Sequence, residues 1–206
     1  MDKHTNIRVV IFDMDGVLVD SEPLINAAAI AMFREKGLVV QPDDFLPFVG
    51  AGEDRYIGGV AEHHGFPLDV PAAKKRTYEI YLDLVSLQLE AFPGVHDLVY
   101  HCREAGLLIA VASSSDGVKV RANLEKIGLP IQCWDAVVTG EDVKNKKPAP
   151  DIFLSAAVKL GANAARMRCV AVATSFPANR LQEADIVRAR TDEVLLADLA
   201  PDLQKG

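Results

Sequence analysis

The sequence predicts an α/β protein with a doubly wound parallel sheet and an inserted α-helical cap. Three observations carry this prediction. A short apolar run at residues 9–12 stops at a pair of aspartates. Residues 22–90 then repeat apolar side chains at helical spacing without a strand signal. After residue 92, strand and helix patterns alternate, which is typical of a parallel sheet covered by helices on both faces.

The first predicted strand ends at two acidic residues. Val9 to Phe12 is an apolar run bounded by polar residues, which indicates a buried strand. Asp13 and Asp15 therefore stand at its carboxyl end, where open α/β sheets bind ligands. Side chains two apart on an extended chain point the same way, so the carboxylates can converge while Met14 turns away. Gly16 permits the sharp turn that follows.

The helical segment that follows is expected to form a separate cap. It opens with Pro23, a usual helix-start residue, and closes at the turn Phe92-Pro93-Gly94. We assign residues 1–20 and 92–206 to the α/β core and residues 21–91 to the cap. The two flanks of the cap are the expected hinges.

The remaining core elements follow from the alternation. We expect helices at residues 95–104 and 118–127 and strands at 107–112, 136–139 and 168–173.

Three serines, Ser113, Ser114 and Ser115, follow the second predicted strand. A hydroxyl at this position can donate a hydrogen bond to a phosphoryl oxygen, as can the backbone amides of the turn. The alternative is that the serines only cap the helix that begins near Gly117, with Asp116 helping at its N-terminus.

A lysine-rich loop precedes the next helix. Lys147 stands directly before Pro148, which biases the lysine backbone toward extended geometry. Its ammonium could neutralise a phosphoryl group and the carboxylate pair. We interpret Lys144 and Lys146 as solvated charges and Asp151 as a dipole partner at the helix start.

With these motifs, from about Val9 to about Leu160, the chain resembles the haloacid dehalogenase (HAD) superfamily of phosphatases and phosphomutases, in the branch with a helical cap. The resemblance implies a Rossmann-like core and a Mg²⁺ cofactor. It implies that Asp13 is the nucleophile that forms an aspartyl phosphate. Asp15 would be the general acid and base and would offer its backbone carbonyl to the metal, so both aspartates are the expected metal site.

The resemblance also implies how a phosphorylated substrate is held. Ser113 matches the second family motif and, with Ser114, is expected to bind the phosphoryl group, while Lys147 matches the third motif. In the cap, Arg55 could meet a second anionic group of the substrate; the alternative is a solvent-exposed helix charge. Phosphomutase relatives usually carry a basic residue earlier in this loop than Arg55, which favours a phosphatase.

The fourth family motif departs from the pattern. Relatives carry a strand that ends in an acidic pair, one member of which binds Mg²⁺. Here the next strand, Arg168 to Ala173, ends in Thr174 and Ser175. Either Ala173 and Thr174 replace the acids, or a whole strand–helix unit of roughly 20 to 25 residues is missing near residues 161–166. We favour the deletion.

A missing unit has consequences for the sheet and for the chemistry. The 168–173 strand could move into the vacated place beside the first strand, and this corner of the site would present hydroxyls instead of acids. Asp13, the Asp15 carbonyl, substrate phosphate and water could still hold Mg²⁺, with lower affinity. We therefore expect weak or absent phosphatase activity.

Composition limits the other possibilities. With 206 residues and 50% hydrophobic content the chain can bury a real core, and no apolar stretch reaches the roughly 18 residues of a membrane span. We expect a cytoplasmic protein, a monomer or weak dimer, with no membrane partner. The net charge of −7 disfavours nucleic acid. The three cysteines match neither a disulfide framework nor a zinc site.

Several functional hypotheses remain. The first is a Mg²⁺-dependent phosphatase of a small phosphorylated metabolite. The others are an impaired relative that binds a phosphorylated ligand or a protein partner, a β-phosphoglucomutase-type phosphomutase, and a phospho-accepting receiver, which the inserted cap disfavours.

Overall fold

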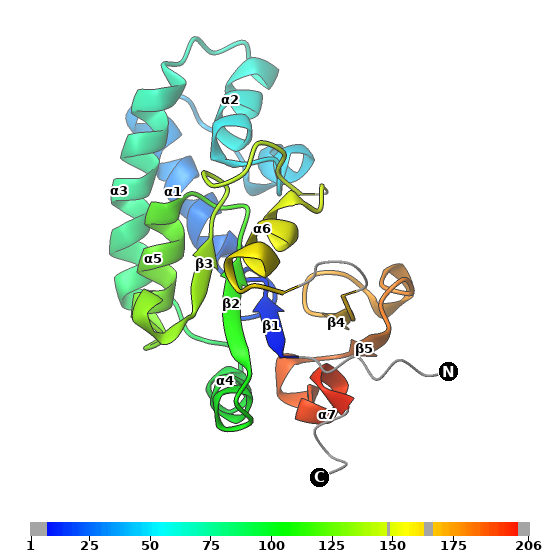
Figure 1. The fold of residues 1–206 in the computed structure, drawn as a ribbon. Helices are drawn as coiled ribbons and strands as arrows, with labels where there is room; N and C mark the ends of the chain where they lie inside the picture. Colours follow the sequence, from blue (N-terminus) through cyan, green and yellow to red (C-terminus); the bar gives the residue numbers. More distant parts are fainter. Residues whose placement is uncertain (1–7, 148, 163–166, 202–206) are drawn as a thin grey trace.

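The computed structural model describes residues 8–147, 149–162 and 167–201. The elements in chain order are β1 (Val9–Phe12), α1 (Glu22–Glu35), the 3₁₀ helix η1 (Pro42–Phe48), α2 (Glu53–His63), α3 (Val70–Gln88), α4 (Val95–Glu104), β2 (Leu108–Ala112), α5 (Gly117–Lys126), the 3₁₀ helix η2 (Ile131–Cys133), β3 (Ala136–Val138), α6 (Asp151–Lys159), β4 (Val170–Val172), the 3₁₀ helix η3 (Ala178–Arg180), β5 (Ile186–Arg188), the 3₁₀ helix η4 (Thr191–Glu193) and α7 (Leu196–Leu199). Figure 1 shows their arrangement.

The main sheet contains three parallel strands in the order β1-β2-β3. Phe12 of β1 pairs with Val111 of β2, and Ala112 pairs with Val138 of β3. Because the strands are parallel and in this register, the residues that follow β1 and β2 lie at the same edge of the sheet. The aspartate pair and the three serines therefore meet there.

Helices cover both faces of this sheet, as the sequence predicts. One core cluster joins β1 and β2 to α4 and α5, with Ile109 and Leu124 fully buried in it. A second, smaller cluster packs Ala112 and Val138 against Ile152 of α6. The prediction of a doubly wound α/β fold is confirmed.

The segment between β1 and α4 folds into helices that have a core of their own. Phe33, Phe45 and Ile57 are buried together in this cap cluster. The ends of α1 and α3 nearest the sheet instead join the main core, through residues such as Ala28 and Tyr81. Figure 1 shows the cap beyond the carboxyl ends of the strands.

The two chain segments that connect core and cap lie side by side. The Phe92 N–H donates to the Leu18 carbonyl at 2.9 Å, and Val19 and Ala91 form an antiparallel bridge. Movement of the cap would therefore bend both connections together.

The region after α6 differs from expectation. The strand β4 forms where the sequence predicts one, but it pairs with β5 in a separate two-stranded sheet and not with β1. The expectation that this strand fills the place beside β1 is wrong. The Arg188–Asp198 ion pair at 2.6 Å ties this small sheet to α7. Most of the expected deletion junction, residues 163–166, lies outside the described residues.

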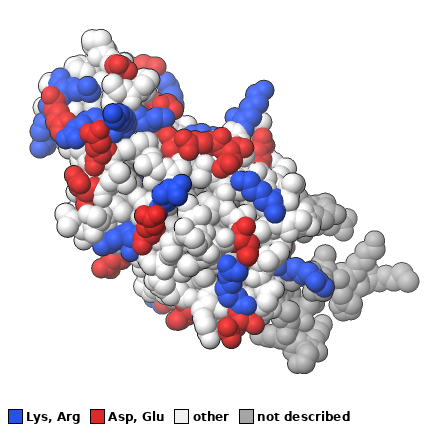
Figure 2. All heavy atoms as spheres, turned by 60° about the vertical axis from the view of Figure 1, so that its left-hand side comes forward, with Lys and Arg blue, Asp and Glu red and all other residues white. Residues whose placement is uncertain are grey.

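The surface carries charges of both signs. Figure 2 shows lysine and arginine side chains intermixed with aspartate and glutamate over one face, which offers no extended basic area there. Among the helices that the structure describes, none is both long and apolar enough to cross a bilayer.

Candidate active site

Asp13 and Lys147 form the centre of the candidate site. The Lys147 Nζ lies 2.6 Å from the Asp13 Oδ1, and it also donates to the Ala112 carbonyl at 3.3 Å. The same Asp13 oxygen accepts the Met14 N–H at 2.7 Å. Burial raises the pKa of Asp13 above its ordinary value, while the Lys147 ammonium acts in the opposite direction. A half-buried carboxylate with a fixed cation beside it can attack an electrophile such as a phosphoryl group.

Asp15 lies on the same side of the chain, held by three side chains. The Ser21 hydroxyl donates to one of its oxygens. The other oxygen accepts the Ser115 hydroxyl at 3.4 Å and lies 3.5 Å from the Lys119 Nζ. Met14 points away from the pair and is fully buried. The alternation that the sequence predicts for these three positions is therefore present.

Lys119 is a residue that sequence reasoning missed. It is only 3% exposed, although it lies on α5, a helix that is polar on average. Burial alone would lower its pKa, but the carboxylate of Asp15, with smaller effects from the cap residues Glu53 and Glu22, raises the pKa above its ordinary value. The site therefore combines two carboxylates with two ammonium groups.

Ser21 is the second residue that was missed. Its position before α1 is typical of a helix cap, but its side chain makes no capping hydrogen bond and instead contacts Asp15. It is completely buried. The sequence signal that could have indicated this contact is the GVLVDSE segment, in which Ser21 follows Asp15 by six residues.

Ser113 and Ser114 follow β2 at the sheet edge that carries the aspartates, and among the described residues neither hydroxyl forms a hydrogen bond with Asp13 or Asp15. Ser113 is buried, and its hydroxyl oxygen accepts the Ser115 N–H at 3.2 Å. The Ser114 hydroxyl is buried and has no hydrogen-bond partner among the residues described. Both hydroxyls keep a proton to donate, so they can serve an anion at this edge of the sheet.

Arg55 is not among the side chains that contact the two aspartates. Its guanidinium pairs with Glu62 at 2.6 Å, lies over the Phe48 ring and belongs to a side chain that is 53% exposed. These contacts correspond to the alternative interpretation, a solvent-exposed charge on the cap. They give no support to Arg55 as a substrate ligand.

Hydroxyl groups occupy the corner of the site next to Gly16. The Thr174 hydroxyl donates to the Gly16 carbonyl, and a Cβ on Gly16 would meet the Ser175 Oγ at 2.5 Å. Gly16 has a φ of +80°, a conformation that favours glycine. The segment after β4 therefore closes over the aspartate turn with side chains that carry no charge.

The donor set fits a magnesium ion held by few protein ligands. Across the part of the chain that the structure describes, no three acidic, histidine or cysteine side chains gather to hold a metal. Asp13 keeps one carboxylate oxygen clear of Lys147, and the Asp15 carbonyl lies in the adjoining turn. Mg²⁺ commonly binds through one or two such groups, with phosphate oxygens and water completing its coordination.

The structure is that of a capped α/β protein with an aspartate pair at the carboxyl end of its first strand. The sequence model of haloacid dehalogenase-like hydrolases matches residues 10–171, and the chain belongs to this family. The match ends within β4, just before the hydroxyl-bearing segment.

Individual relatives agree with this assignment. The chain is 44% identical over 209 residues to the protein SUPPRESSOR OF QUENCHING 1, chloroplastic, of Arabidopsis thaliana, covering 90% of this chain but 20% of that protein. It is 31% identical to hexitol phosphatase B of Escherichia coli, covering 82% and 76% of the two chains. The crystal structure of CbbY from Rhodobacter sphaeroides in complex with phosphate superposes with a TM-score of 0.80 at 23% identity, covering 94% and 99%. At that identity, the superposition shows the fold alone.

Proposed function

We propose that the protein hydrolyses phosphate monoesters of small phosphorylated sugars or polyols through an aspartyl phosphate on Asp13. The observation that carries this proposal is the 2.6 Å pair between Asp13 and Lys147, next to the anchored Asp15, at the carboxyl end of the sheet. A hexitol phosphatase among the relatives supports the substrate class.

The reaction follows from the positions of the two carboxylates. An Asp13 oxygen attacks phosphorus, the ester P–O bond breaks, and Asp15 gives its proton to the departing alcohol oxygen. Asp15 then takes a proton from water, the water oxygen attacks phosphorus, and the bond between phosphorus and the Asp13 oxygen breaks, which releases phosphate and restores the Asp13 carboxylate. Lys147 and the hydroxyls of Ser113 and Ser114 would hold the phosphoryl oxygens during both steps.

Magnesium is proposed as the cofactor, held by the Asp13 carboxylate and the Asp15 main-chain carbonyl. When bound, it would neutralise negative charge on the transferred phosphoryl group. Because Thr174 and Ser175 supply hydroxyls near Gly16, where the resemblance implies an acidic pair, we propose weak Mg²⁺ affinity and slow turnover. A monomeric or weakly dimeric state and a cytoplasmic location stay predictions.

The missing acid also supports a second candidate function, a protein that binds a phosphorylated ligand without turning it over. One experiment separates the two candidates. Phosphate release from glucitol 6-phosphate is measured with and without Mg²⁺, for the native chain and for a version with an acidic strand–helix unit restored after Gly161. Slow turnover in the native chain that rises on restoration supports the weakened phosphatase. Binding without release in the native chain, with release only after restoration, supports the second candidate.

A matched comparison tests the chemistry itself. Asp13→Asn should abolish release, whereas Asp20→Asn, at an exposed position in the same segment, should leave it unchanged. Equal rates for Asp13→Asn and the native chain would contradict the phosphatase proposal. A phosphomutase would instead convert a sugar phosphate to its isomer with no net release.

A further inference from the structure

Three buried polar atoms lack a hydrogen-bond partner among the described residues: Glu53 Oε2, Tyr78 OH and Ser114 Oγ. The first two belong to the cap, and the third belongs to the core. Buried polar groups are nearly always paired, so an unpaired one needs an explanation. A ligand held between cap and core would provide partners for such atoms.

Glu53 is the most unusual of the three because it carries a charge. It begins α2 and is 7% exposed, whereas the next two side chains, Asp54 and Arg55, are both more than half exposed. Gly52, with a φ of +87°, precedes it at the N-cap position of α2. Burial raises the pKa of Glu53, and Lys119 only partly opposes that effect.

The neighbours of Glu53 show that it lies close to residues of the core. A Cβ on Gly52 would meet the Lys146 Nζ at 2.9 Å, so the start of α2 touches the loop that carries Lys147. The charge of Glu53 also influences Lys119, whose ammonium lies 3.5 Å from Asp15. Glu53 thus lies where the cap meets the core, near Lys119 and Lys146.

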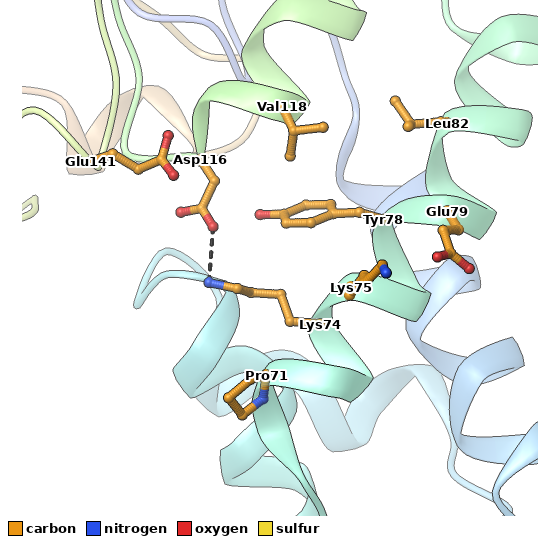
Figure 3. Close-up of a pocket in the computed structure, with 9 residues that line it drawn as sticks. All are labelled: Pro71, Lys74, Lys75, Tyr78, Glu79, Leu82, Asp116, Val118 and Glu141. Atoms are coloured by element: carbon orange, nitrogen blue, oxygen red, sulfur yellow. Dashed lines mark hydrogen bonds and ion pairs between the residues drawn. The ribbon is translucent and has the colours of Figure 1, made fainter.

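The nearby cations are already engaged by other carboxylates. Asp116 pairs with Lys74 of α3 at 3.1 Å and with Lys146 at 3.6 Å. Figure 3 shows the Lys74–Asp116 contact and the Tyr78 hydroxyl directed toward Asp116, at a pocket of about 400 Å³ between α3 and the start of α5. Among the described residues, Glu53 therefore forms no ion pair where the cap meets the core.

We propose that Glu53 selects the substrate by accepting a hydrogen bond from a hydroxyl group on its non-phosphorylated part. The site then takes polyhydroxylated phosphate monoesters and rejects those that also carry a carboxylate. This inference rests on the proposed function. A buried acceptor penalises any ligand that leaves it unpaired, and an anionic group on the ligand would be repelled as well.

Two ligands test the inference because they differ at one carbon. Glucitol 6-phosphate carries a hydroxymethyl group at C1, where 6-phosphogluconate carries a carboxylate. Binding of each is measured by titration calorimetry in the Asp13→Asn background, so that turnover does not interfere. The protein should bind glucitol 6-phosphate at least about tenfold more tightly, and Glu53→Gln should reduce that preference about tenfold or more.

Matched variants make the result specific to the position. Glu62→Gln removes an exposed carboxylate from the same helix and should leave the preference unchanged. Glu53→Asp keeps the negative charge and should retain the discrimination against 6-phosphogluconate. This second variant still tests the inference if Glu53→Gln does not fold.

The outcomes separate this inference from the proposed function. If both ligands bind and Glu53→Gln leaves their ratio unchanged, Glu53 does not select the substrate, although the phosphate site stands. If neither ligand nor inorganic phosphate binds, the proposed function fails and this inference fails with it.

Discussion

The Lys119 Nζ lies 3.5 Å from the Asp15 Oδ2, so α5 supplies the acid–base candidate with a buried cation. Lys147 provides the corresponding cation for Asp13 at 2.6 Å. Each carboxylate is therefore balanced by its own ammonium before any ligand enters. A phosphoryl group entering between them would meet both positive charges, which favours its binding.

Replacing Lys119 by methionine should destabilise the fold by about 1–3 kcal/mol, because Asp15 would lose its buried partner. The folded-state pKa of Lys119 is raised, so its contribution is present below its unfolded value of about 10.5 and is lost as pH rises through the folded pKa. Urea unfolding should therefore give the same loss at pH 6 and pH 9. Arg121→Met, at an exposed position on α5, should have little effect. Unchanged stability in Lys119→Met would contradict the ion pair.

Replacing Lys147 by methionine should slow turnover and change its pH dependence. Lys147 lowers the pKa of Asp13 against the effect of burial, so its removal raises that pKa further. Because the nucleophile must be ionised, the acidic limb of the kcat/KM profile should move to higher pH. Lys144→Met, in the same loop but exposed, is the control. A profile that keeps its acidic limb in Lys147→Met would show that this lysine does not act on the nucleophile.

The first strand and the acidic pair that follows it could be predicted from sequence because several local signals agree. An apolar run, two aspartates at i and i+2 and a glycine allow few other structures. The neighbours of Lys147 in sequence, above all Pro148, likewise single out this lysine from the others in its loop. Local patterns of this kind do not depend on which distant segments pack nearby.

Lys119, Ser21 and the position of β4 could not be obtained in the same way. A lysine on a polar helix normally faces solvent, and a serine before a helix normally caps it. Both residues instead contact Asp15, which is far from Lys119 in sequence and six residues before Ser21. An apolar run predicts that a strand forms but does not indicate which strand it pairs with. Here β4 pairs with β5.

Gly16 should tolerate substitution poorly. Gly16→Ala adds a side chain at a φ of +80° and brings a Cβ to 2.5 Å from the Ser175 Oγ. Gly37→Ala, at a φ of +88° with open space around the new Cβ, carries the conformational strain alone. We expect Gly16→Ala to lose about 1 kcal/mol more stability than Gly37→Ala in denaturant unfolding. Equal losses would mean that the Thr174–Ser175 segment does not press on the aspartate turn.

Glu53 should reduce stability at neutral pH when no ligand is bound. Burial raises its folded pKa, so its favourable contribution is present below the unfolded value of about 4.5 and is lost as pH rises through the folded pKa. Glu53→Gln should therefore gain about 1 kcal/mol over the native chain at pH 7.5 and almost nothing at pH 4. The difference between the two unfolding curves at each pH measures this gain. A gain independent of pH would contradict a buried carboxylate here.

The covalent intermediate is the most direct test of Asp13 as the nucleophile. The protein is mixed with glucitol 6-phosphate and Mg²⁺, quenched in acid within the first turnover, digested and analysed by mass spectrometry. We predict one phosphoryl group on the peptide that contains Asp13, and none in the Asp13→Asn variant. A phosphoryl group on another residue, or phosphate release that continues in Asp13→Asn, would contradict the account.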